Sequence, residues 1–157
     1  FMLMEDQYGI GDDIDVGQAT GVVEGITLRA TILRGDDGTV WHVPNGEIRR
    51  VGNRTQLWSA AIVDIEVAYD ADLTLAKAVL QETADDVCKS EPFANSVLEA
   101  PKVLGVQSVA ASGVTLRLIV KTAPGAQWAL QRALREATKS ALDTNGVQMS
   151  FTARLAT

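Results

Sequence analysis

The sequence has a single cysteine, four prolines, few aromatic residues and no excess of basic residues. One cysteine, Cys88, excludes an internal disulfide and fits a reducing compartment. Four prolines in 157 residues, of which 46% are hydrophobic and 22% charged, are typical of one or two compact domains rather than of a disordered chain. A formal net charge of -6 argues against binding nucleic-acid backbones, or anionic lipid through a basic patch.

Long apolar runs are also absent. No stretch of eighteen apolar residues occurs, so the sequence predicts no segment that spans a bilayer. A signal peptide is not expected either, because a charged start followed by a long apolar core is missing. The chain begins with Phe1 and a short apolar cluster instead of an initiator methionine. We therefore expect a fragment, the later part of a longer protein.

Residues up to about 53 contain strand and turn signals and no good helix, with glycines recurring at short intervals. The clearest predicted strand covers 26–34, where the alternation of apolar and polar residues predicts that Ile26, Leu28, Ala30 and Ile32 face a core. A hairpin turn at 35–38 and a return strand at 40–43 follow. This half predicts a small, strongly bent sheet of about five strands, of the Sm-like or SH3-like barrel kind.

The pattern changes near Ser59, and the second half alternates strands with amphipathic helices. Val63, Ile65, Val67 and Tyr69 predict a half-buried strand, and the next helix follows the candidate caps Asp70 and Asp72. Two strands, a second helix and a last strand are predicted at 103–111, 114–122, 126–144 and 147–155. The order βαββαβ is the ferredoxin-like arrangement. The sequence thus predicts an α+β protein with an Sm-like domain at 1–58 and a ferredoxin-like domain at 59–157.

Candidate catalytic or metal-binding residues are few. His42, the only histidine, could serve as a general base or metal ligand, but no second ligand stands at suitable spacing, which favours a structural or interface role. Cys88 lies on the edge of an apolar helix stripe, which favours a packed thiol over a nucleophile. The pairs Asp12-Asp13, Asp36-Asp37 and Asp85-Asp86 are better explained by turns, capping and solvation than by acid–base work.

Basic, glycine-rich and aromatic segments give no clear active site either. Arg49-Arg50, with Arg54, forms a short basic cluster that suits a solvated or inter-subunit role better than phosphate binding on this acidic background. The glycines of 17–21 lack the ending of a phosphate loop. Trp41, Trp58 and Trp128 are more typical of a core or an interface than of a ligand cage. We predict no catalytic residues, no metal and no cofactor. Possible subunit-interface residues are Trp41, His42, Arg49 and Trp58.

Several of these motifs occur together in a recognisable order. The first half contains Gly-Asp-x-Ile-x-x-Gly at 11–17, Gly-x-Val-x-x-Ile-x-Leu-Arg-x-Thr-Ile at 21–32, then Asp37-Gly38, Pro44-Asn45, Ile48 and Asn53. This set resembles the β domain of the small-conductance mechanosensitive channel family. In the second half, Pro-Gly-x-Gln-Trp at 124–128 and Asn-Gly-Val at 145–147 resemble the αβ domain of that family.

The resemblance implies a bacterial membrane channel that opens under bilayer tension during osmotic downshock and releases ions and small solutes. Its transmembrane helices would precede Phe1. The family assembles as a ring, usually of seven subunits, in which the β domains form a collar and the αβ domains a vestibule on the cytoplasmic side. The motif residues would then be architectural: Gly11, Asp12, Gly17, Gly21, Asp37, Gly38, Pro44, Asn45 and Asn53. A soluble ring-forming Sm-like scaffold, a ligand-binding module and a small-molecule regulatory domain remain alternatives.

Overall fold

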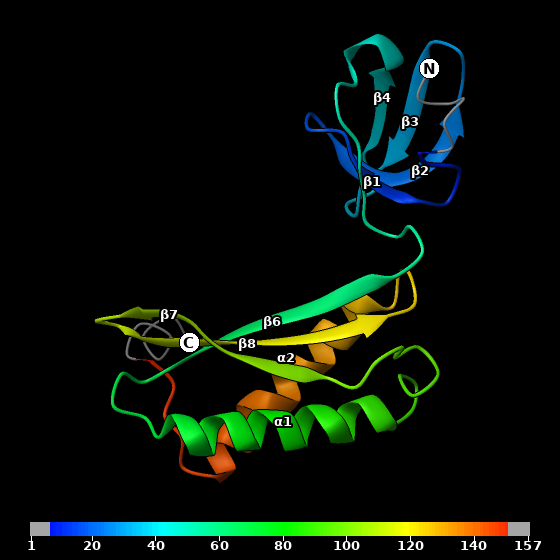
Figure 1. The fold of residues 1–157 in the computed structure, drawn as a ribbon. Coiled ribbons are helices and arrows are strands. Elements are labelled where there is room, and N and C mark those ends of the chain that lie inside the picture. Colours follow the sequence, from blue (N-terminus) through cyan, green and yellow to red (C-terminus); the bar gives the residue numbers. More distant parts are fainter. Residues whose placement is uncertain (1–6, 151–157) are drawn as a thin grey trace. The chain divides into compact units, whose positions relative to one another are not determined.

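The computed structural model describes residues 7–150 of a mixed α+β protein with two sheets and two helices (Figure 1). The chain divides into two compact units, Phe1–Ser59 and Ala60–Thr157. Among residues 7–150, no helix is both long enough and apolar enough to cross a membrane.

Unit 1 contains a five-stranded sheet with the order β4-β3-β2-β1-β5. Neighbouring strands that pair in this sheet run antiparallel, and β2 carries a register shift between Val23 and Gly25 that bends it. A small apolar core packs within this unit, and the five strands match the predicted number. The elements are β1 (Asp13–Asp15), β2 (Thr20–Ile26), β3 (Ala30–Arg34), β4 (Val40–Pro44), a short 3-10 helix η2 (Asn45–Glu47) and β5 (Gly52–Asn53). The buried apolar residues are Tyr8, Ile14, Val16, Ala19, Val23, Leu33, Val43 and Ile48.

The prediction of a single strand over 26–34 is wrong, because β2 ends at Ile26 and β3 begins at Ala30. The chain turns between β2 and β3, where the Thr27 and Ala30 backbones pair and the Thr27 hydroxyl accepts a hydrogen bond from the Ala30 N–H at 3.0 Å. The predicted facing is reversed as well: Leu28 is 94% exposed, whereas Thr31 and Leu33 are fully buried. The side chains of β3 that face the core are therefore Thr31 and Leu33, and one of these two residues is polar.

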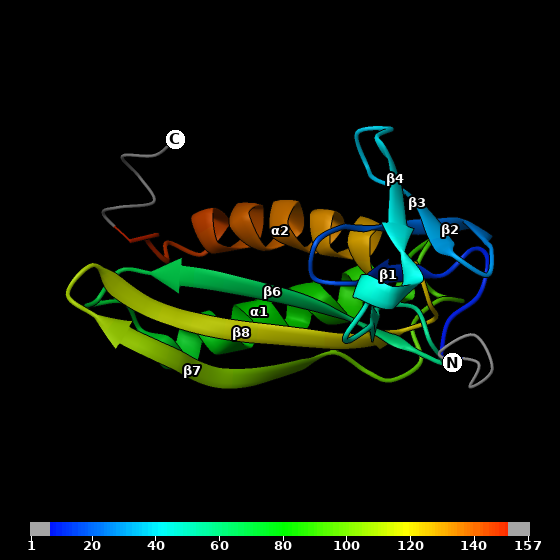
Figure 2. The same ribbon diagram turned by 90° about the horizontal axis from the view of Figure 1, so that it is seen from above.

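Unit 2 has a three-stranded sheet with the order β6-β8-β7, and both helices lie on one face of it (Figures 1 and 2). The two helices also pack against each other. On the opposite face, Arg117 makes two 2.8 Å hydrogen bonds to the carboxylate of Asp64, which lower the pKa of that carboxyl. The elements are β6 (Ser59–Val67), α1 (Leu73–Lys89), β7 (Lys102–Ala110), β8 (Gly113–Thr122) and α2 (Gln127–Thr144).

The apolar alternation of β8 buries Val114, Leu116, Leu118 and Val120 beneath the helices, as the sequence predicts. At the end of α2, Gly146 adopts a left-handed φ of 73° and donates its N–H to the Asp143 carbonyl, which confirms the predicted stop.

Two further predictions for unit 2 need correction. Strand β6 ends at Val67, so Tyr69 does not belong to the strand. Its side chain is 65% exposed, whereas Val63, Ile65 and Val67 are buried as predicted. The predicted last strand, 147–155, lies largely outside the described residues. Within them, Met149 forms a single antiparallel bridge to Val67.

The N-terminus of α1 is capped by Asp72, whose carboxylate accepts the Leu75 N–H at 3.1 Å. Of the two predicted caps, Asp70 does not take this role. We expect Asp72→Ala to lower the free energy of unfolding of unit 2 by about 1 kcal/mol, because the N–H loses its acceptor. Denaturant titration with hydrogen-exchange mass spectrometry measures this change. Asp70→Ala is the matched control and should stay within about 0.5 kcal/mol of the unsubstituted chain; equal effects of both would contradict the assignment.

Strand β7 is an edge of the unit 2 sheet as described, and it departs twice from regular pairing with β8. The register shifts between Val103 and Gly105 and again between Val106 and Ser108. Gly105 has a left-handed φ of 109°. Three apolar side chains on this strand are largely exposed, Leu104, Val106 and Val109.

Candidate functional site

The predicted residues Asp12 and Asn53 meet in one polar network that ties β1 to β5. The Asp12 carboxylate accepts hydrogen bonds from the Gly9 N–H at 3.0 Å, the Asn53 side-chain amide at 3.1 Å and the Thr55 hydroxyl at 3.3 Å. Gly11 adopts a left-handed φ of 94°, which lets the chain turn just before β1 begins at Asp13. The carboxylate is thus occupied by donors of its own chain, which suits a structural role better than acid–base chemistry.

Asn45, which follows β4, forms a second network. Its backbone N–H donates to the Arg29 carbonyl at 2.8 Å and its side-chain amide to the Thr27 carbonyl at 2.9 Å. Its side-chain oxygen accepts a 2.7 Å hydrogen bond from the Thr31 hydroxyl, which also contacts the Tyr8 hydroxyl at 2.9 Å. Asn45 therefore holds the turn between β2 and β3 in place. It also gives the hydroxyl group of the buried Thr31 a hydrogen-bond acceptor.

The Asp37-Gly38 pair forms the tip of the β3–β4 hairpin. Asp37 accepts the Thr39 N–H at 3.0 Å, and this hydrogen bond is the main cause of the lowered pKa of its carboxyl. Gly38 has a left-handed φ of 86° and donates its N–H to the Gly35 carbonyl. Gly21, on β2, faces the backbone at the end of β3: a Cβ at this position would overlap the Arg34 carbonyl. Only glycine leaves the two strands at this separation.

The residues predicted for a subunit interface all lie at the surface of unit 1. Trp41 and Trp58 are 45% and 51% exposed, and His42 and Arg49 are exposed as well. Trp41 and His42 belong to β4, one edge of the sheet, whereas Arg49 precedes β5, the other edge. Trp58 follows Leu57, a non-glycine residue with a left-handed φ of 66°.

Sequence reasoning missed an ion pair between Asp13 and Arg54. Arg54 donates from its Nε to the Asp13 carboxylate at 2.6 Å, and Asp13 is only 5% exposed. The two residues stand 41 positions apart, and only the folded sheet brings them together. The nearest signal was the basic cluster of 49–54, which did not identify the acidic partner.

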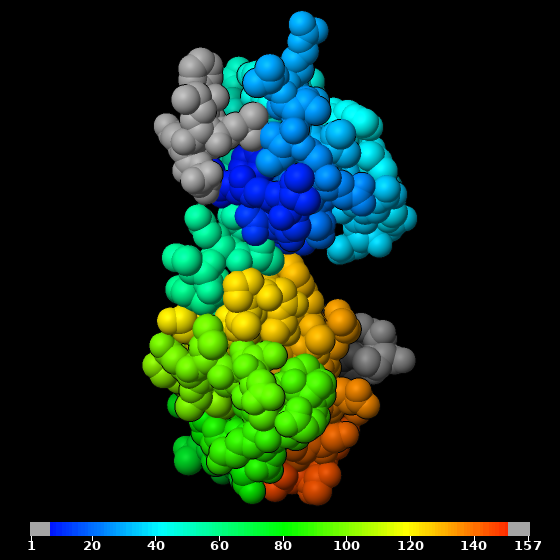
Figure 3. All heavy atoms as spheres, turned by 90° about the vertical axis from the view of Figure 1, so that its right-hand side faces the viewer, coloured from blue at the N-terminus to red at the C-terminus, as the bar shows by residue number. Residues whose placement is uncertain are grey.

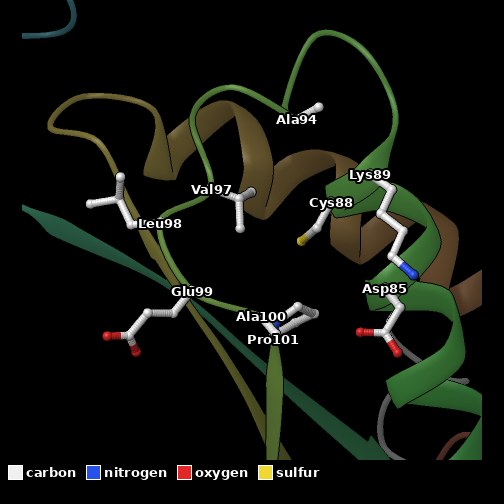
Figure 4. A pocket seen from close by; sticks show the side chains of 9 residues that line it. All are labelled: Asp85, Cys88, Lys89, Ala94, Val97, Leu98, Glu99, Ala100 and Pro101. Carbon is white, nitrogen blue, oxygen red and sulfur yellow. The ribbon is translucent and has the colours of Figure 1, made fainter.

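A pocket of about 350 Å³ lies in unit 2 between the end of α1 and the segment that leads into β7. Figure 4 shows the Cys88 sulfur and Val97 directed into it, with the charged side chains Asp85, Lys89 and Glu99 around it. Glu99 lies within 3.4 Å of the Lys121 ammonium group. Burial, reinforced by the charge of Asp85, raises the pKa of Cys88 to about 11. A thiol in this state is a weak nucleophile, as the sequence predicts.

We expect iodoacetamide to alkylate Cys88 about 100-fold more slowly in the folded chain than in the unfolded chain near pH 8, since the thiolate is the reactive form. The rate in the folded chain should rise about tenfold per pH unit until pH approaches the raised pKa. Mass spectrometry of quenched samples gives both rates. The unfolded chain in denaturant is the control, and equal rates in the two states would contradict a packed thiol.

The described residues bring together no cluster of metal ligands. No group of three or more His, Cys, Asp or Glu side chains within residues 7–150 converges as metal ligands would. His42 is exposed on an edge strand, and Asp12 and Asp37 are engaged by backbone donors. The class that this arrangement defines is a two-unit α+β protein, whose motif residues Asp12, Asn45 and Asp37 are engaged in hydrogen bonds that shape strands and turns.

Comparison of the sequence with models of known protein families identifies two matches. Residues 1–56 match the model for the mechanosensitive ion channel beta-domain, and residues 61–149 match that for the MscS C-terminal domain. The chain belongs to the MscS family of mechanosensitive ion channels. This family consists of ion channels, not enzymes.

Individual relatives agree with this assignment. The chain is 32% identical over 151 residues to a small-conductance mechanosensitive channel of Caldanaerobacter subterraneus subsp. tengcongensis, covering 96% of the chain and 52% of that protein. It is 24% identical over 148 residues to the moderate conductance mechanosensitive channel YbiO of Escherichia coli, covering 94% of the chain and 20% of that protein. The chain therefore spans about half of the first relative and a fifth of the second.

Solved structures share the fold. Helicobacter pylori MscS in its closed state matches with a TM-score of 0.76 at 20% identity, covering 96% of the chain and 58% of that structure. Arabidopsis thaliana MSL1 matches with a TM-score of 0.65 at 20% identity, covering 95% of the chain and 55% of that structure.

Proposed function

We propose that the chain is the cytoplasmic part of a tension-gated small-conductance channel in a bacterial cell membrane, acting in the release of ions and small solutes on osmotic downshock. The observation that carries this proposal is the succession of two channel-family domains in one chain, which match 1–56 and 61–149. In this proposal residues 1–58 form the β domain and residues 59–157 the αβ domain. Nucleic acid is not among the expected partners of a chain with net charge -6.

The finer architecture is part of the proposal. The strand order β4-β3-β2-β1-β5, with η2 between β4 and β5, supports an Sm-like barrel for the β domain. The order β6-β8-β7 with both helices on one face supports a ferredoxin-like αβ domain, whose fourth strand would add beside β6 where Met149 bridges Val67.

A ring of identical subunits, seven in the full-length protein, is proposed as the assembly. The sheet of unit 1 ends in β4 on one side and β5 on the other, and a ring covers such edges by joining each subunit to the next. The β domains would form a collar beneath the pore and the αβ domains a vestibule. Within the collar, the networks of Asp12 and Asn45 and the close backbone contact at Gly21 would hold the shape of each subunit.

The test is to express the native gene that encodes this chain in a bacterial strain without mechanosensitive channels of its own. We expect survival of osmotic downshock and pressure-activated currents in membrane patches. The empty vector serves as the negative control and a known channel gene as the positive control. A well-expressed protein that neither rescues the cells nor conducts would overturn the proposal.

A further inference from the structure

The segment that connects β5 to β6 contains a strained turn. Leu57 has a φ of 66° and is the one non-glycine residue within 7–150 whose φ is positive. The Trp58 N–H donates to the Gln56 carbonyl at 2.8 Å, so these three residues form a γ-turn in its rare, left-handed form. A left-handed φ costs leucine free energy, because its Cβ comes too close to the following carbonyl oxygen.

The side chain of Leu57 does not compensate for this strain. It is 86% exposed, and Figure 3 shows the blue-green spheres of this segment at the surface. Glycine and asparagine accept a left-handed φ far more readily than leucine does. Backbone strain of this kind persists where contacts outside the strained residue enforce it. The residues that flank Leu57 must therefore impose its conformation.

Hydrogen bonds hold the chain on both sides of the turn. On one side, Arg54 donates its backbone N–H to the Asp13 carbonyl at 2.9 Å and its Nε to the Asp13 carboxylate at 2.6 Å. On the other side, the hydroxyl of Ser59, a residue that is 5% exposed, donates to the Arg54 carbonyl at 2.7 Å. This last bond closes a loop over 54–59, and Leu57 lies inside the closed loop.

The 54–59 loop is also the connection between the two units. Ser59 is the last residue of unit 1 and the first residue of β6. In the closed loop a single hydrogen bond joins Ser59 to Arg54, although five positions separate them in the chain. Five extended residues span roughly 17 Å. Release of Leu57 to an extended φ would therefore remove its strain and lengthen the connection.

We propose that the 54–59 loop is a conformational switch with a closed and an open form. In the closed form the Ser59–Arg54 hydrogen bond is made and Leu57 is strained. In the open form this bond is broken, Leu57 is relaxed and the connection is longer. The strain brings the two forms closer in free energy than they would be with an unstrained residue at 57. The proposal goes beyond the proposed channel function and does not depend on it.

Substitution of Leu57 in the 157-residue chain tests the switch. Hydrogen exchange followed by NMR gives the protection factor of the Trp58 amide, the exchange rate of an unstructured peptide divided by the observed rate. Leu57→Gly and Leu57→Asn should raise it about threefold, because the closed form loses its strain while glycine also gains freedom in the open form. Leu57→Ala keeps the strain at an exposed position, so it is the matched control and should change the protection factor less than about twofold.

Two further variants favour the open form. Leu57→Pro fixes φ at about −65° and cannot form the closed turn, and Ser59→Ala removes the donor of the closing hydrogen bond. Each should lower the protection factor of the Trp58 amide at least about threefold, while the amides of β1 and β2 stay protected.

Three results would overturn the proposal. The first is equal protection of the Trp58 amide in the glycine, asparagine and alanine variants of Leu57, because strain would then not control the loop. The second is unchanged protection in Ser59→Ala, because the Ser59–Arg54 bond would then not close it. The third is loss of protection throughout unit 1 in Leu57→Pro, because opening would then be unfolding of the unit and not a local change.

Discussion

Gly21→Ala should unfold unit 1 or lower its free energy of unfolding by roughly 3 kcal/mol. A methyl group at this position would lie 2.7 Å from the Arg34 carbonyl carbon and 3.0 Å from the Gly35 nitrogen, in addition to overlapping the Arg34 carbonyl oxygen. These are backbone atoms of a paired strand and cannot rotate aside as the end of a side chain can. The strands β2 and β3 would have to separate, with loss of the hydrogen bonds that join them.

Hydrogen-exchange mass spectrometry measures this effect for each unit separately, which matters because a two-unit chain need not unfold in one step. Protection should fall in β2 and β3 and stay unchanged in unit 2. Gly46→Ala is the matched control, because Gly46 has no positive φ and no atom within 4 Å of an added Cβ. Its variant should stay within about 0.5 kcal/mol of the unsubstituted chain. An intact unit 1 in the Gly21 variant would contradict the close backbone contact.

Leu116→Ala should lower the free energy of unfolding of unit 2 by about 3 kcal/mol. Leu116 is fully buried on the helix-facing side of β8, so its truncation removes buried apolar surface and leaves a cavity beneath the helices. Denaturant titration followed by the fluorescence of Trp128, the tryptophan of unit 2, gives the change. Trp41 and Trp58 are replaced with phenylalanine in the background chain so that the signal is specific.

The matched control for this substitution lies on the neighbouring strand. Leu104 on β7 is 58% exposed, so the same leucine-to-alanine change there should cost less than about 0.5 kcal/mol. If the two variants were equally stable, the buried set of β8 would not form the core of unit 2.

The sequence predicts an element of the fold well when the residues that determine the element are close together in the chain. Strand β8 and the end of α2 follow from local patterns: four apolar residues at every second position and an Asn-Gly stop. The turn at 27–29 carries no glycine, proline or asparagine, and its key partner, Asn45, comes 18 positions later in the chain. The same long-range contact explains the reversed facing of β3, because Asn45 and Tyr8 satisfy the hydroxyl of buried Thr31. Local alternation could not supply that information.

For the candidate site, the residue types were predictable and their partners were not. The sequence singled out Asp12 and Asn53 as separate motif positions, and only folding joins them in one network. It singled out Trp41, His42, Arg49 and Trp58 by type, and their roles as an interface remain a prediction. The Asp13–Arg54 pair depends on the pairing of β1 with β5, which spacing along the chain does not encode.

The irregular edge of unit 2 bears on how concentrated solutions of this chain behave. Fibrils of the amyloid type grow when an incoming segment copies a run of evenly spaced amide and carbonyl groups along an open strand. Strand β7 interrupts that spacing twice within nine residues. The apolar side chains displayed there consequently offer no continuous template, and fibrous aggregation should not start from this edge.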